Sequence, residues 1–145
     1  MDEFVKQLSK EFDYERHEIK TDLIQIYVRS NRTKVRCPYC GAIGRRIHSW
    51  YKRRFQDLPM QGKKVEIVLK NRKYYCSNLE CKQTTFAETF DCVPFKGKRS
   101  ERLTASIIDI SLNMSSVKAA SILKKGTADV GKSTICNLIK KGLTN

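Results

Sequence analysis

The chain has 145 residues, 40% of them hydrophobic, and a formal net charge of +14 at pH 7. This length suits one ordinary domain or two small ones. Because no window approaches about eighteen apolar residues and the first residues lack a signal-peptide pattern, we expect a cytoplasmic protein that is neither exported nor membrane-spanning.

The positive charge is concentrated in the middle of the chain. Residues 31–102 contain eighteen basic and six acidic side chains, whereas residues 1–30 contain five basic and seven acidic ones. Concentrated like charge destabilises a folded domain unless a polyanion neutralises it. We therefore expect a nucleic acid as the partner, and neither a membrane nor a small-molecule substrate.

The N-terminal part is predicted to contain a helix followed by a hairpin. Phe4, Leu8 and Phe12 recur every four residues, which predicts an amphipathic helix over residues 3–12. The β-branched run over residues 19–29 predicts a strand. After a turn at residues 30–32, a second short strand should lead into Cys37.

Four cysteines form the clearest motif of the sequence. Two residues separate Cys37 from Cys40, and four separate Cys76 from Cys81. Two such pairs can surround one ion at about 2.3 Å per sulfur and leave no open coordination position. We therefore predict a structural Zn²⁺ site. The alternatives are buried free thiols or disulfides, of which a cytoplasmic location disfavours the disulfides, and His48 in place of one cysteine is a minor one.

A hairpin should connect the two cysteine pairs, as in a zinc ribbon. Residues 45–56 and 65–72 alternate in polarity, and residues 59–62 have turn chemistry. One face should be apolar and the other cationic, with an indole that can stack or, alternatively, simply lie on a solvated face. The predicted nucleic-acid contacts from this hairpin are Arg46, Trp50, Lys52, Arg53, Arg54, Lys70 and Arg72.

Three helices are predicted after a basic linker at residues 96–100. They cover residues 101–112, 117–125 and 132–141 and form a helix-turn-helix pattern. In the last one, Ile135, Leu138 and Ile139 form the packing stripe. Its other side carries residues suited to a major groove, although an ordinary amphipathic helix facing water is the alternative. These residues are Lys132, Ser133, Thr134, Asn137, Lys140 and Lys141.

The expected fold class is α+β. A small zinc-ribbon-like antiparallel β domain, with an N-terminal helix and hairpin, should occupy residues 1–95. A three-helix helix-turn-helix domain should follow at residues 96–145.

A phosphate-loop pattern also occurs near the C-terminus. Gly126, Gly131, Lys132 and Ser133 satisfy it letter for letter. A phosphate loop follows a buried strand in a large parallel sheet, which the surrounding residues do not provide. A nucleotide-binding protein is therefore only a minor alternative.

A resemblance to a known family is carried by residues 37–41 (CPYCG), 46–49 (RIHS), 57–59 (DLP) and 85–88 (TFAE). These motifs resemble the N-terminal portion of the ISL-three family of bacterial insertion-sequence transposases. Next to the linker residue Lys98, Arg99 and Arg102 resemble the basic entry to the first helix of that family's recognition domain.

The resemblance implies binding to double-stranded DNA at terminal inverted repeats, in the bacterial nucleoid, and leaves a homodimer open. In the family, a separate DDE-type domain cleaves and joins the strands. Metal-dependent strand transfer needs several converging carboxylates, and the fifteen acidic residues here lie mostly near the N-terminus or beside lysines. We therefore expect DNA binding without catalysis. An RNA-binding zinc ribbon is the alternative.

Overall fold

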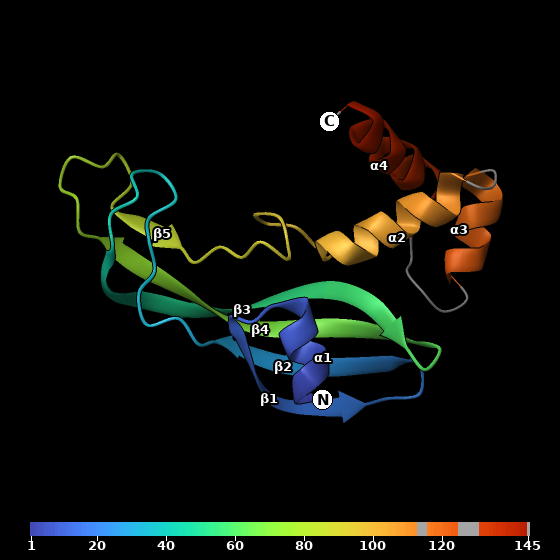
Figure 1. Ribbon diagram of the computed structural model, residues 1–145, viewed down its shortest axis with the longest axis horizontal. Coiled ribbons are helices and arrows are strands. Elements are labelled where there is room, and N and C mark those ends of the chain that lie inside the picture. The colour runs from blue at the N-terminus through green and yellow to red at the C-terminus, as the bar shows by residue number, and fades with distance from the viewer. Residues whose placement is uncertain (113–115, 125–130, 145) are drawn as a thin grey trace.

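The computed structural model describes residues 1–112, 116–124 and 131–144, with the backbone alone at residues 116 and 141–144. Four helices and five strands in these residues make an α+β fold (Figure 1). In chain order they are α1 (Asp2–Leu8), β1 (Phe12–Ile19), β2 (Leu23–Ser30), β3 (Gly44–Met60), β4 (Lys63–Cys76), β5 (Thr85–Ala87), α2 (Glu101–Leu112), α3 (Ser116–Lys124) and α4 (Lys132–Thr144). No helix among the described residues is long and apolar enough to cross a bilayer.

The sheet is mixed, not purely antiparallel as predicted. Its order is β1-β2-β4-β3, and β5 pairs with β4. The β2–β4 pair is parallel, running from Leu23 opposite Lys64 to Arg29 opposite Lys70, whereas the other pairs are antiparallel. Side chains alternate with a period of two in both arrangements, so the sequence pattern could not indicate the direction of this pair.

The N-terminal helix is shorter than predicted. It ends at Leu8, and Ser9 is already extended with φ −158° and ψ 133°. Phe12 begins β1 instead, and its buried ring lies 4.8 Å from that of Phe90. The predicted strand at residues 19–29 corresponds to β2, but its hairpin partner is β1, and only an isolated bridge between Arg36 and Ile43 flanks the first cysteine pair.

The predicted hairpin between the cysteine pairs is confirmed and is longer than expected. It runs from Gly44 opposite Cys76 to Met60 opposite Lys63, and its turn has positive φ at Gln61 and Gly62. Positive φ at both central residues matches the right-handed twist of the strands. The hairpin therefore extends as an arm from the main core to the loops that carry the cysteine pairs, near β5 at the left in Figure 1.

The main core lies on one face of the sheet, under α1 and residues 90–93. Phe55, Val65, Ile67 and Leu69 are buried there, as the alternation predicted. Alternation along β3 places Tyr51 on the same side, but this residue is exposed and lies beyond the residues of this core. The uncovered part of this sheet face, around Tyr51, lines a cleft.

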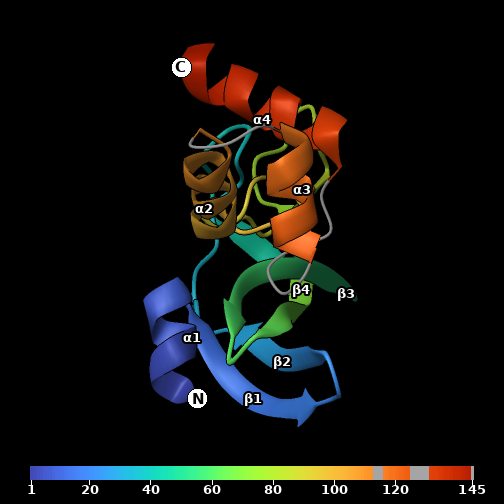
Figure 2. The same cartoon turned by 90° about the vertical axis from the view of Figure 1, so that its right-hand side faces the viewer.

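The three C-terminal helices share a second core. Leu103, Ile107, Ala119, Leu123 and Ile135 are fully buried in it, and the helices gather above the sheet in Figure 2. The segments joining these helices, at residues 113–115 and 125–130, lie outside the described residues.

Asp57 on β3 links the two cores. Its buried carboxylate accepts a 2.7 Å hydrogen bond from the Ser100 hydroxyl and two from the Arg102 guanidinium. Ser100 Oγ also accepts the backbone N–H of Leu103, which caps the start of α2. Glu101 and the residues after it are thereby held against the hairpin.

Candidate metal centre and nucleic-acid interface

The first cysteine pair lies on a tight turn that points both sulfurs the same way. The Cys37 N–H donates to Ala42 O at 2.7 Å, and the Gly41 N–H donates to Cys37 O at 2.8 Å. Gly41 has φ +80°, a conformation that side chains rarely adopt. The sequence Cys-Pro-Tyr-Cys-Gly therefore closes the turn directly after Cys40.

The second cysteine pair lies on the loop between β4 and β5. The Cys76 N–H donates to Thr84 O at 2.9 Å, which closes the loop at its base. Asn78 folds the inside of the loop, because its backbone O accepts from the Cys81 N–H and its side-chain Oδ1 accepts from the Glu80 N–H. This internal turn accommodates the four-residue spacing and returns Cys81 towards Cys76.

The four sulfurs fit one tetrahedral zinc ion. All four Sγ atoms lie within 4.8 Å of one another, with Cys37 to Cys81 at 3.9 Å and Cys40 to Cys76 at 3.5 Å. Sulfurs about 2.3 Å from a central Zn²⁺ would be about 3.8 Å apart. Disulfides are excluded, because an S–S bond is about 2.05 Å long and all four cysteines are free. The clustering of these four cysteines supports the predicted Zn²⁺.

Two thiols of the site, those of Cys40 and Cys76, differ in pKa. A backbone hydrogen bond from Ala42 lowers the pKa of Cys40 to about 7. A backbone hydrogen bond from Asn78 favours the Cys76 thiolate, but burial and the neighbouring thiols outweigh it and raise the pKa of Cys76 to about 12. One thiolate thus forms readily, and a divalent cation is needed to hold several together.

His48 does not join this cluster. Its ring packs edge-on against Tyr75 at 4.9 Å, and Nδ1 hydrogen-bonds Ser49 Oγ at 2.9 Å. The mixed site considered as a minor alternative is therefore wrong.

A small hydrophobic core packs against the metal site. Val35, Tyr74 and Phe86 pack around Cys37, with the last two rings stacked 5.9 Å apart. Gly44 lies so close to these rings that a Cβ there would be 3.0 Å from both Tyr74 and Phe86. The metal ion and this packing together fix the far end of the hairpin arm.

The sheet face opposite the main core carries a groove of about 430 Å³ lined by cations and aromatic rings. Trp50, Lys52 and Arg54 point to this face from β3, and Lys70 lies opposite Lys52 on β4. Lys70 Nζ lies 4.5 Å from the centre of the Trp50 ring, and the indole is 48% exposed. Arg54 approaches Glu66 at 3.4 Å but stays exposed. We call this groove and its cations the open face.

Two neighbouring strands contribute residues to the open face that the sequence did not single out. Arg16 of β1 lies over the Tyr27 ring of β2, with its guanidinium carbon 3.7 Å from the ring centre. Their contribution depends on the order of strands in the sheet, which brings β2 beside β4. Arg46, nearer the cysteines, is exposed and stacks over Tyr75 at 4.7 Å.

Arg72, named among the predicted contacts, is used inside the protein. Its guanidinium donates to both carboxylate oxygens of Glu88, at 2.9 and 3.0 Å, and to Ser30 Oγ and Arg32 O. Only 11% of the Arg72 side chain is exposed, and the Glu88 carboxylate is fully buried. We therefore remove Arg72 from the proposed interface.

Two further arginines also make internal contacts. Arg102 forms a two-pronged ion pair with Asp57, which raises the pKa of the guanidinium. Arg53 donates to Pro94 O and Gly97 O and thereby holds the turn before the linker. Their structural roles account for their positions, so neither is kept as a free phosphate contact.

The linker backbone is pinned to β3 while its side chains differ in exposure. The Gln56 N–H donates to Lys98 O at 2.9 Å, and the Ser100 N–H donates to Gln56 O at 2.8 Å. The Lys98 side chain is exposed and that of Arg99 is half-buried. Lys98 remains available to an external anion.

Helix α4 packs through the predicted stripe and exposes most of the predicted contact residues. Ile135 is buried, and Leu138 and Ile139 pack beside it. Its exposed side chains are Lys132, Ser133, Asn137 and Lys140, whereas Thr134 is half-buried. The side chain of Lys141 and most of the phosphate-loop pattern, residues 126–130, lie outside the described residues.

Comparison with known protein families gives a match to the segment that carries the cysteines. Residues 33–81 match the family described as the zinc-finger of transposase IS204/IS1001/IS1096/IS1165. The match contains all four cysteines and the whole β3–β4 hairpin. Neither the curated proteins nor the solved structures give a match. The predicted resemblance is thereby confirmed for the zinc-binding segment, which is similar to the N-terminal zinc-binding portion of ISL3-type transposases.

Proposed function

We propose that this chain is a zinc-dependent DNA-binding module of a transposase-like protein, which recognises element ends or an operator-like site in duplex DNA. The observation that carries the proposal is the open face, a cationic and aromatic surface on strands that extend from a transposase-type zinc site. Phosphate contacts position a protein on DNA without reading its sequence. We assign this positioning role to Arg46, Lys52, Arg54 and Lys70.

Base reading is assigned to the three-helix unit as a helix-turn-helix, with the proposed boundary between the two units at residues 95 and 96. Support comes from the polarity of α4, which packs through Ile135 and exposes Lys132, Ser133 and Asn137. An asparagine can bond adenine through two hydrogen bonds in the major groove, and serine and lysine can bond bases or phosphates.

No catalytic step is assigned to this chain. Strand transfer by metal ions requires carboxylates that converge on the ions. Among the described residues, the buried carboxylates are those of Asp57 and Glu88, and they are instead neutralised by Arg102 and Arg72. Binding alone is therefore the function that the described residues support.

Selection of bound sequences from a random duplex pool tests the proposal. The zinc-loaded chain should enrich a consensus, and an inverted repeat within it would indicate that two copies bind together. Asn137→Ala should weaken binding to the consensus by about 1–3 kcal/mol and to random duplex little. Ser121→Ala, an exposed position on α3, is the matched control and should change neither affinity.

Two outcomes of this experiment contradict the proposal. If no sequence is enriched, the chain does not recognise a site in duplex DNA. If Asn137→Ala weakens consensus and random duplex equally, α4 does not read bases. Competition by RNA of equal length at matched salt tests the RNA-binding alternative, because a ribbon selective for RNA would release duplex DNA.

A further inference from the structure

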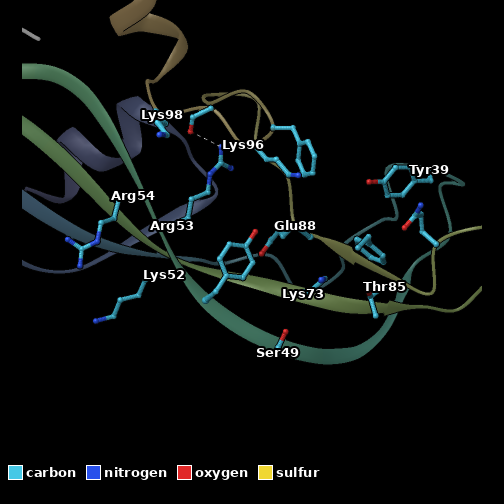
Figure 3. Close-up of a pocket in the computed structure, with 16 residues that line it drawn as sticks. Tyr39, Ser49, Lys52, Arg53, Arg54, Lys73, Thr85, Glu88, Lys96 and Lys98 are labelled. Carbon is cyan, nitrogen blue, oxygen red and sulfur yellow. Dashed lines mark hydrogen bonds between the residues drawn. The ribbon is translucent and has the colours of Figure 1, made fainter. Parts of the chain in front are cut away.

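A second cationic region lies on the core side of the hairpin arm, opposite the open face. Successive β3 side chains alternate between faces, so Ser49, Tyr51 and Arg53 share the face of the buried Phe55. The cover formed by residues 90–93 does not reach Tyr51. The core face therefore continues as a cleft of about 630 Å³ between the arm and the turn at residues 94–97 (Figure 3).

The turn that forms one wall of this cleft is held in a strained conformation. Lys96 has φ +58°, which is rare for a residue with a side chain. The Gly97 N–H donates to Pro94 O at 2.8 Å, and Arg53 donates to the carbonyls of Pro94 and Gly97. The turn thereby presents Phe95 and Lys96 as exposed side chains.

The cleft is strongly cationic. Lys73, Lys96 and Lys98 line it, and none of them pairs with a carboxylate in the part of the chain that the structure describes. Glu88 is the acidic residue of the lining, but its carboxylate is buried and neutralised by Arg72. Lys52 and Arg54 point away towards the open face (Figure 3). The cleft therefore has cations of its own, separate from those of the open face, that can attract an anion.

Three exposed aromatic rings accompany these lysines. Tyr39, Tyr51 and Phe95 line the cleft from three separate segments and are 59%, 44% and 57% exposed. Exposed rings between unpaired lysines suit a ligand that alternates flat apolar groups with negative charges. A single nucleic-acid strand has this chemistry, because its bases can stack on rings while its phosphates meet cations. A duplex hides its base faces.

We propose that this cleft binds an unpaired DNA strand, with bases stacked on Tyr51, Phe95 and Tyr39 and phosphates near Lys73, Lys96 and Lys98. This proposal rests on the proposed function, because both require that the chain binds DNA. It adds a second site, which binds single-stranded DNA. The strand would lie on one side of the arm, and the duplex on the other.

Two adjacent aromatic residues of β3 allow a matched test. Tyr51 faces the cleft and Trp50 faces the open face, so Tyr51→Ala and Trp50→Ala remove exposed rings from opposite sides of one strand. Fluorescence anisotropy of the zinc-loaded chain would use labelled single-stranded dT12, a random duplex of equal length and single-stranded U12. Phe95→Ala is a second cleft variant, on an exposed turn outside the core, and Tyr51→Phe keeps the stacking ring.

Wild-type protein should bind dT12, and Tyr51→Ala and Phe95→Ala should each weaken this binding roughly 5- to 150-fold. Duplex binding by these two variants should stay within about twofold of wild type, and Tyr51→Phe should bind dT12 nearly as wild type does. Trp50→Ala should show the opposite preference. Zinc content and circular dichroism of each variant establish that it is folded.

Other results overturn the proposal. These are unchanged dT12 binding by folded Phe95→Ala and Tyr51→Ala, an equal loss in Trp50→Ala, or tighter binding of U12 than of dT12. If wild-type protein binds the duplex but not dT12, the cleft proposal fails and the proposed function stands. If it binds neither, the proposed function fails as well.

Discussion

Replacing Arg72 by methionine should destabilise the protein strongly without acting on DNA contacts directly. The change leaves the fully buried Glu88 carboxylate with the Ser30 hydroxyl at 2.6 Å and the Arg32 guanidinium at 3.7 Å. Removing one partner of a buried ion pair typically costs about 3–5 kcal/mol. For a domain of this size, that loss lowers the melting temperature by roughly 10–15 °C.

Lys70→Met is the matched control, because Lys70 lies two residues away on the same side of β4 and is exposed. Its contact with Trp50 at 4.5 Å is an exposed cation–π pair worth about 0.5–1 kcal/mol. Thermal unfolding of the zinc-loaded protein, followed by circular dichroism, should therefore show little change. Duplex affinity should fall instead, and its salt dependence should decrease by about one counterion.

A double-mutant cycle separates the buried charge from other effects of Arg72→Met. Glu88→Gln removes the charge, so the double variant should be destabilised less than the sum of the single variants. A structural role of Arg72 is contradicted if Arg72→Met melts within about 3 °C of wild type, which is less than one kcal/mol, and loses duplex affinity as Lys70→Met does. Arg72 would then contact DNA, as its position in the sequence pattern first indicated.

Two further predictions concern packing and thiol reactivity. Gly44→Ala should cost about 1–3 kcal/mol in chemical denaturation, because the new Cβ would lie 3.0 Å from Tyr74 and Phe86; wild-type stability would contradict the close packing. Burial, together with the charge of Asp57, raises the pKa of Cys92 to about 11. At pH 8 iodoacetamide should therefore alkylate Cys92 about two orders of magnitude more slowly than in urea-unfolded chain, as peptide mass spectrometry can measure; equal rates would contradict the protected thiol.

Local patterns predicted the parts of the fold that depend on nearby residues. The spacing of Cys37, Cys40, Cys76 and Cys81 was sufficient to predict that these four sulfurs cluster, because metal geometry constrains that spacing directly. Alternation along the hairpin predicted its buried side, and the apolar stripe around Ile135 predicted how α4 packs. Each of these predictions needed only the repeat of hydrophobic residues along one strand or helix, or the spacing of metal ligands along the chain.

Features that depend on distant residues could not be predicted in this way. Arg72 looks like its exposed neighbour Lys70 in the sequence, and only the fold brings Glu88 and Ser30 to it. The spacing of Phe12 from Leu8 predicts a helix, but in the structure Phe12 begins a strand and its ring packs against Phe90. The cleft could not be predicted, because alternation places Tyr51 on the apolar face of the hairpin, whereas in the structure this residue is exposed.

The dependence of DNA binding on zinc is tested most directly by measuring bound zinc and duplex affinity on the same sample during titration with a chelator. We expect one zinc ion per chain and a loss of duplex binding in proportion to the zinc removed, with recovery when zinc is restored. Stoichiometric zinc far below one, or full duplex affinity after its removal, would contradict the claim that a metal ion organises the DNA-binding surface.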